Sequence, residues 1–354
     1  MARPSLPWIA RRDEEDSTGV DVTSLRAAAT ARKRRKLQEQ DYWRHWRSIE
    51  PEPVACCVCG STTTARFLDA PLAPGDVVRC TTCSMVFVSP VTIRGLDLSP
   101  EQEAEAERLR SSSDIADLDG CWEMQFLACE EARTASDRDH RDVLARLLEY
   151  LPDRGRMLDF GAGWGQFTGA AAADGWDVVG IEPTPGRALH AREAKGLDVR
   201  TTTLTPDLFP PEHFDAVVSL QVFEHLDDPA AEIDRIFGVL RPGGILAIEV
   251  PSIASPLVRL MGGSHRHFNP DHFWFFSPET LKRMLRTHGF VVRETYLPTR
   301  HLSLSWVSQA VLRRYVPDRV GDALVNGVKH SPFSDTVVPL NVGDVVMAIA
   351  QKPR

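Results

Sequence analysis

The sequence lacks a run of about 18 apolar residues, the length that a helix needs to cross a bilayer, so it predicts no transmembrane helix. Residues 1–25 also lack the apolar stretch of a secretory signal peptide, and Arg11-Arg12 runs directly into the acidic residues 13–16. These two absences indicate a cytoplasmic protein. The sequence has no internal repeat.

The chain has no excess of basic residues. Its formal net charge is −8, which argues against a protein built mainly to coat nucleic acid. The charge is uneven, at +3 over residues 1–50 and −11 over the rest of the chain. With 43% hydrophobic and 25% charged residues, the composition excludes a wholly disordered or fibrous protein. A length of 354 residues is enough for about two domains with a large core.

The basic residues gather near the N-terminus. Residues 1–23 are polar and without periodicity, so we expect a disordered tail. Residues 24–50 combine helix formers, a basic run at 32–36 and the aromatic residues Trp43 and Trp46, and they predict a basic, aromatic helix. This helix can dock its tryptophans on the main domain or contact a polyanion by charge and stacking. The acidic charge of the whole chain favours docking.

Five of the seven cysteines lie close together. Cys56 and Cys59 form one CxxC pair, Cys80 and Cys83 form another, and four thiolates at this spacing are typical of a tetrahedral Zn²⁺ site. Such a site has no open coordination position, so the Zn²⁺ is expected to be structural, within a zinc-ribbon module at residues 51–95. Two redox disulfides are the alternative interpretation.

The other three cysteines are not expected to bind metal. Cys57 could replace Cys56, but Cys57-Val58-Cys59 is too close for the usual turn. Cys121 and Cys129 fall on a helical pattern, where we expect small core or surface residues.

Beyond a linker at 96–119, residues 120–354 alternate between helix-like and strand-like segments. Such alternation is typical of a parallel sheet flanked by helices. Helices are predicted at 121–150, 164–174, 186–195, 228–240 and 277–289. Strands are predicted at 156–160, 177–182, 198–202, 214–220, 245–250, 290–297 and 344–351.

A glycine-rich loop joins the first predicted strand to a helix. The segment Leu158-Asp159-Phe160-Gly161-Ala162-Gly163-Trp164-Gly165 lets a ligand approach the backbone at a helix N-terminus. It departs from the GxGxxG pattern of dinucleotide-binding loops, because the third glycine is at 165 and residue 166 is Gln. Asp159 favours a nearby cationic amine, and Glu182, which ends the next strand, can accept hydrogen bonds from two ribose hydroxyls. A ligand with a ribose, a cationic amine and no phosphate is S-adenosylmethionine.

With this loop, residues 120–354 resemble the class I methyltransferases, whose first motif is D/E-x-G-x-G-x-G. The segments 214–225 and 240–244 resemble their fourth-strand motif and the turn before their fifth strand. The resemblance implies an α/β, Rossmann-like, mostly parallel seven-stranded sheet with helices on both faces, and S-adenosylmethionine as cofactor. It places the loop after the third strand beside the adenine. The implied cofactor-binding residues are Asp159, Gly161, Ala162, Gly163, Gly165, Glu182, Thr203, Leu204 and Gln221.

The combination of zinc module and core is similar to bacterial methyltransferases that modify sugars and other biosynthetic intermediates. Residues 270–281 and 341–346 fit that group. Its sugar C-methyltransferases usually carry a longer additional C-terminal domain, whereas this chain ends soon after the last predicted strand. O-methylation of a small-molecule acceptor, such as a sugar or glycan precursor, is therefore favoured over C-methylation.

Methyl transfer requires mainly the alignment of donor and acceptor, with a general base when the acceptor is a poorly acidic hydroxyl. Substrates of such sheets bind beyond the carboxyl ends of the strands. Glu224 and His225 follow the fourth strand, and His272 lies in the insertion after the fifth, where its aromatic neighbours can exclude water. We predict these three as catalytic residues, with His272 favoured as the base. His265 and His267, in the same insertion, are weaker candidates.

Three functions compete. A small-molecule methyltransferase is favoured. An RNA methyltransferase would use the zinc module and the basic helix to grip phosphate, but the acidic core and the absence of an N-P-P-Y-type motif after the fourth strand argue against it. A catalytically silent scaffold would not need the intact Asp159, glycines and Glu182.

Overall fold

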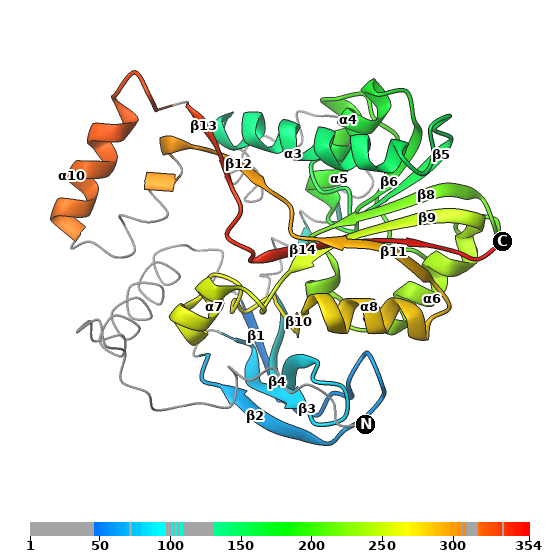
Figure 1. Cartoon of the computed structure of the whole chain (residues 1–354), viewed down its shortest axis with the longest axis horizontal. Helices are drawn as coiled ribbons and strands as arrows, with labels where there is room; N and C mark the ends of the chain where they lie inside the picture. The colour runs from blue at the N-terminus through cyan, green and yellow to red at the C-terminus, as the bar shows by residue number, and fades with distance from the viewer. Residues whose placement is uncertain are drawn as a thin grey trace.

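A computed structural model describes residues 46–70, 73–96, 101, 103–104, 107–108, 130–305, 307–308, 318–334 and 336–354 (Figure 1). The predicted tail at 1–23, residues 24–45 of the predicted helix, Cys121 and Cys129 lie outside this part of the chain.

The predicted helix at 24–50 is wrong over its last residues, because Trp46–Glu52 is strand β1. This strand pairs antiparallel with β4 (Val86–Leu96), with Ser48 opposite Ile93. Ile49 packs against the buried core. A partner strand that is distant in sequence thus overrides the local helix preference.

The central sheet has seven strands in the order β11-β14-β9-β8-β5-β6-β7. The strands are β5 (Arg156–Phe160), β6 (Asp177–Ile181), β7 (Val199–Arg200), β8 (Phe214–Leu220), β9 (Leu240–Pro251), β11 (Val291–Tyr296) and β14 (Val345–Gln351). The five strands from β9 to β7 are parallel, and β14 runs antiparallel to both β9 and β11. The predicted seven-stranded, mostly parallel sheet is confirmed.

Helices cover both faces of this sheet (Figure 1). One face carries α3 (Glu130–Leu148), α4 (Gln166–Ala173) and α5 (Pro185–Glu193), and the other carries α6 (Pro229–Val239) and α8 (Pro278–Thr287). The helix starts follow capping chemistry. The Asp228 side chain accepts from the Ala231 N–H at 3.1 Å, and Ser277 and Thr280 form a reciprocal capping box.

The cysteines lie in a second, smaller sheet in the order β1-β4-β3-β2, which includes β2 (Thr64–Leu68) and β3 (Gly75–Cys80). We call residues 46–96 the cysteine module. A short strand from the segment that follows β9, β10 (Trp274–Phe275), pairs with β4. Buried module residues such as Cys80 and Phe87 share one hydrophobic cluster with Phe214 and Leu246 of the central sheet. The module and the central sheet therefore have a common core.

The insertion after the fifth strand was predicted from the sequence, but the helical elements within it were not, and neither was the insertion between β11 and β14. Between β9 and β10 lie α7 (Pro256–Met261) and a 3₁₀ turn, η5 (Gly262–Ser264). Between β11 and β14 lie a hairpin of β12 (Arg300–Ser303) and β13 (Val337–Leu340), and the helix α10 (Asp318–Lys329). Among the described residues, no helix is both long and apolar enough to span a bilayer.

Candidate functional site

The glycine loop connects β5 to α4. Gly163 has a φ of 53°, and a Cβ built on it would meet nothing within 4 Å, so its face of the loop is open. Gly165 has a φ of 74°, and a Cβ there would lie 2.8 Å from Leu197 and 2.9 Å from Ala191. The two glycines thus serve different purposes: Gly165 packs the loop onto α5, and Gly163 leaves room for a ligand at the backbone.

The carboxylate of Glu182, directly after β6, is hydrogen-bonded to the backbone of this loop. Its Oε2 accepts the Gly163 N–H at 2.9 Å, and its Oε1 accepts the Thr184 N–H at 2.9 Å. Each carboxylate oxygen keeps a second lone pair, so Glu182 can both hold the loop and accept from ribose hydroxyls.

Asp159, near the end of β5, is 2% exposed and accepts a hydrogen bond from the Thr168 hydroxyl at 2.6 Å. Burial raises the pKa of Asp159 to about 7. A cation nearby would favour its ionised form.

Two further predicted cofactor residues differ in what they can offer. Leu204 is 2% exposed and belongs to the hydrophobic core, so it can contact a ligand only through its backbone, whereas the neighbouring Thr203 is exposed.

Trp164, within the loop, has its ring edge-on to His190 of α5 at 5.6 Å between ring centroids. Its carbonyl accepts from Lys195 at 2.6 Å.

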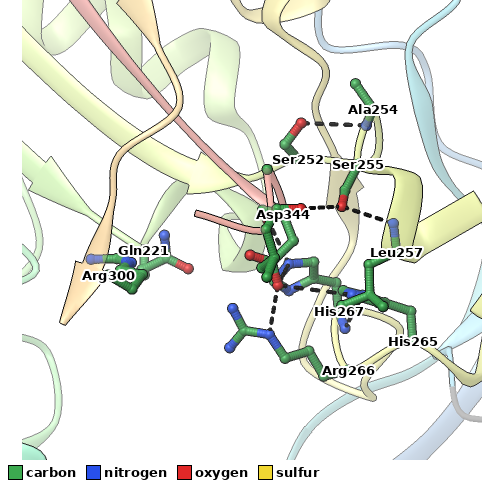
Figure 2. A network of polar contacts seen from close by, with 12 residues as sticks. Gln221, Ser252, Ala254, Ser255, Leu257, His265, Arg266, His267, Arg300 and Asp344 are labelled. Atoms are coloured by element: carbon green, nitrogen blue, oxygen red, sulfur yellow. Dashed lines mark hydrogen bonds and ion pairs between the residues drawn. The ribbon is translucent and has the colours of Figure 1, made fainter. Parts of the chain in front are cut away.

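Gln221, after β8, has a left-handed φ of 57° and is tied to β9. Its backbone N–H donates to the Glu249 carbonyl at 2.9 Å, and its side-chain amide donates to the Glu249 carboxylate at 3.0 Å. Arg300 also bonds this carboxylate and lies 3.3 Å from Asp139 of α3. Figure 2 shows Gln221 and Arg300 side by side. Although burial opposes it, the two carboxylates raise the pKa of Arg300.

Glu249 is a candidate site residue that was not predicted from the sequence. It is 2% exposed and was placed within an apolar predicted strand. The available signal was the carboxylate itself, because a charged residue in an otherwise apolar buried strand needs a partner or a ligand.

The three predicted catalytic residues come together. The Nδ1 of His225 lies 2.7 Å from the Asp271 carbonyl, and its Nε2 faces the Glu224 carboxylate at 3.9 Å. The His272 ring lies edge-on to His225 at 4.7 Å between centroids. Glu224 is 1% exposed, its Oε2 has no hydrogen-bond partner among the described residues, and burial raises its pKa to about 7. This group can hold and exchange a proton near neutral pH.

His265 and His267 form a different cluster, centred on Asp344 (Figure 2). Arg266 donates to the Asp344 carboxylate at 3.0 Å, and the Nε2 of His267 bonds the Asp344 carbonyl at 2.7 Å. Despite burial, His267 and Arg266 hold the pKa of Asp344 well below its usual range. These contacts join the insertion after β9 to the start of β14, which favours a structural role for both histidines.

The four predicted metal ligands also converge. Their sulfur atoms all lie within 4.8 Å of one another, with Cys56 to Cys83 at 3.4 Å and Cys59 to Cys80 at 3.5 Å. Disulfide sulfurs would lie about 2.05 Å apart. Four sulfurs around Zn²⁺ at about 2.3 Å would lie about 3.8 Å apart, close to the spacing found here.

The two cysteine turns are alike in backbone geometry. The Gly60 N–H donates to the Cys56 carbonyl at 2.8 Å, and the Ser84 N–H donates to the Cys80 carbonyl at 2.9 Å. Gly60 and Ser84 both have a φ of 68°. Cys57 is not part of the converging group. The donor set and its two matching turns fit a metal of the tetrahedral thiolate class.

Known proteins show similarity to the central sheet region. A family model described as a methyltransferase domain matches residues 131–295. A Mycolicibacterium smegmatis protein named "Probable S-adenosylmethionine-dependent methyltransferase" is 30% identical, and the match covers 45% of this chain and 60% of the relative. A ubiquinone biosynthesis O-methyltransferase from Bradyrhizobium sp. is 30% identical over 39% of this chain and 59% of the relative. One of the same name from Cereibacter sphaeroides is 30% identical over 46% of this chain and 76% of the relative.

Proposed function

Because the chain belongs to the family of S-adenosylmethionine-dependent methyltransferases, we propose that it transfers a methyl group from S-adenosylmethionine to a small-molecule acceptor. One observation carries the proposal. Four adjacent strands, β6, β5, β8 and β9, each have one carboxyl group at most 5% exposed at or just after the carboxyl end, namely Glu182, Asp159, Glu224 and Glu249. The Glu249 carboxylate is already paired with Arg300, so the other three carboxyl groups are the ones that favour a cationic ligand and repel phosphate at this edge.

The chain's own residues bind and orient the cofactor. S-adenosylmethionine, when bound, supplies a methyl group activated by a sulfonium. The open face at Gly163 would let the cofactor approach the backbone, and the remaining lone pairs of Glu182 would accept hydrogen bonds from its ribose hydroxyls. Asp159 would balance its positive charge. Gly161, Ala162, Gly165, Thr203, Leu204 and Gln221 complete the proposed cofactor-binding set.

His272, His225 and Glu224 act on the acceptor. A proton leaving an acceptor hydroxyl passes to His272 or to His225, whose Nε2 faces the Glu224 carboxylate. A hydroxyl acceptor, as on a sugar or glycan precursor, needs such a base. The O-methyltransferase names of the relatives support transfer to oxygen.

Cys56, Cys59, Cys80 and Cys83 hold one structural Zn²⁺, supported by the convergence of their sulfurs and by the two matching turns. With four thiolate ligands, this metal has no open position for chemistry.

Transfer of a labelled methyl group tests the proposal. Purified protein is incubated with methyl-labelled S-adenosylmethionine and, separately, with the small-molecule fraction and the RNA fraction of a cell extract. We expect label in the small-molecule fraction. Label in RNA alone would favour the RNA methyltransferase, and no label in either fraction would favour a silent scaffold.

A further inference from the structure

We propose that the cysteine module forms one wall of the acceptor half of the site, so that metal in the module holds His272 in place while the cofactor half stays independent of it. The inference rests on the proposed function for the roles of the two halves. The cofactor half is residues 156–204 together with Gln221, and the acceptor half is residues 222–276. The histidine segment is residues 262–276 within the acceptor half.

The first contact is a pair of strands. β10 begins two residues after His272, and it pairs with β4 of the module, with Trp274 opposite Phe87. The Val88 N–H donates to the Phe273 carbonyl at 2.9 Å. The rings of Phe87 and Trp274 are stacked at 5.5 Å between centroids, and both are buried. The module therefore supplies both the strand partner and the packing surface of β10.

The same short segment is also hydrogen-bonded to the turn at residues 224–226, which carries Glu224 and His225. The Phe273 N–H donates to the Glu224 carbonyl at 2.8 Å, and the Trp274 indole N–H donates to the Leu226 carbonyl at 2.7 Å. Phe273 thus accepts a hydrogen bond from the module through its carbonyl and donates one to Glu224 through its amide. A shift of β10 would move His272 and the Glu224–Leu226 turn together.

A second contact with the module lies near the start of the histidine segment, at Gly263. A Cβ built on Gly263 would lie 1.8 Å from the Asp69 carbonyl oxygen and 2.7 Å from the Ala70 Cα, both backbone atoms of the module. The module therefore meets the histidine segment at Gly263 and at Phe273, and His265, His267 and His272 lie between these two points.

The metal ligands set the position of β4. β3 ends at Cys80, and β4 begins three residues after Cys83. The Cys80 N–H donates to the Met85 carbonyl at 2.8 Å, which joins the second cysteine turn to the start of β4. In contrast, Asp159 and Glu182 take their hydrogen bonds from Thr168, Gly163 and Thr184, all within the cofactor half.

Hydrogen exchange measured by mass spectrometry, on full-length protein with and without its metal, tests this coupling. Metal is removed by a chelator, and S-adenosylmethionine binding is measured by calorimetry on the same samples. We expect amides of residues 262–276 to exchange about tenfold faster or more without metal. We expect S-adenosylmethionine affinity to change by less than about twofold, because its contacts lie elsewhere. Faster exchange in residues 75–91 with unchanged exchange in 262–276 would overturn the proposal, as would purified protein without bound metal.

A steric variant keeps the test decisive if chelation unfolds the chain. Gly263→Ala adds a Cβ that must push Asp69 and Ala70 away, whereas Gly238→Ala, the matched control in α6, adds one that meets nothing within 4 Å. We expect faster exchange in 262–276 for Gly263→Ala only, with metal content and S-adenosylmethionine binding retained. Equal exchange in both variants would overturn the coupling. Absence of S-adenosylmethionine binding in the unmodified protein would instead contradict the proposed function.

Discussion

The cofactor half and the acceptor half of the site are built from contacts of different range. In the cofactor half, the hydrogen bonds of Asp159 and Glu182 reach partners 2 to 19 residues away. In the acceptor half, His225 reaches Asp271 and Trp274 reaches Leu226, 46 and 48 residues away, and Phe273 is also bonded to Val88 in the module. A short motif can therefore encode the first half, while the second exists only once distant segments have folded together.

The largest expected effect comes from breaking the acceptor half alone. Because the base is needed only for chemistry, His272→Ala should lower turnover of a hydroxyl acceptor by about 10²–10⁴-fold, with cofactor affinity almost unchanged. Single-turnover rates, measured once the acceptor is known, check this against His225→Ala and against His330→Ala, which alters an exposed histidine. Near wild-type rates in both His272→Ala and His225→Ala would show that no histidine acts as the base.

The second prediction concerns the metal on which the acceptor half depends. Cys80→Ser should reduce bound Zn²⁺ from one per chain to nearly none, because it removes one of four thiolates. Cys57→Ser is the matched control and should keep full occupancy, since Cys57 is outside the converging group. Metal analysis of protein purified without added zinc gives the answer. Full zinc in the Cys80 variant would refute the ligand assignment.

A third variant weakens the cofactor half alone. Glu182→Ala removes the charge-assisted hydrogen bonds to the ribose, each about 1.5–3 kcal/mol, so S-adenosylmethionine affinity should fall about tenfold or more. Glu193→Ala, at the exposed end of α5, serves as control and should bind normally. Calorimetry measures both variants, and unchanged affinity in Glu182→Ala would remove Glu182 from the cofactor site.

The smallest expected effect is a pH dependence of cofactor binding. Burial raises the pKa of Asp159 to about 7, and a cation beside it favours the ionised form. Affinity for S-adenosylmethionine should therefore rise between pH 6 and pH 8, by about tenfold at most. Without ligand, the free energy of unfolding depends on pH in the opposite direction. The pKa of Asp159 is higher in the folded protein than in the unfolded chain, so the stability that Asp159 contributes is lost as pH rises through about 7.

Two variants separate the groups that titrate near pH 7. Asp159→Asn should bind more weakly and lose the pH dependence. Glu224→Gln, which removes the other carboxyl group with a pKa of about 7, should retain it because Glu224 lies in the acceptor half. The reverse pattern would place the titrating group in the acceptor half.

The same contrast in contact range explains what could be predicted from the sequence. The strands at 156–160 and 214–220 match the structure, because each is mostly apolar and mostly buried and has parallel strands as its neighbours in the sheet. The end of the helix predicted at 24–50 was wrong, and the pairing of β10 was missed, because both depend on β4. Glu249 was missed because its partners, Gln221 and Arg300, lie 28 and 51 residues away.

Calorimetric titration of the unmodified protein with S-adenosylmethionine, and with NAD as comparison ligand, tests the central claim most directly. The sheet edge is acidic, Gly163 leaves space beside the backbone, and the Glu182 carboxylate oxygens each keep a lone pair for a ribose hydroxyl. These features predict one S-adenosylmethionine bound per chain. They predict no comparable binding of NAD, because the acidic edge repels its pyrophosphate. Tighter binding of NAD, or no binding of S-adenosylmethionine, would contradict it.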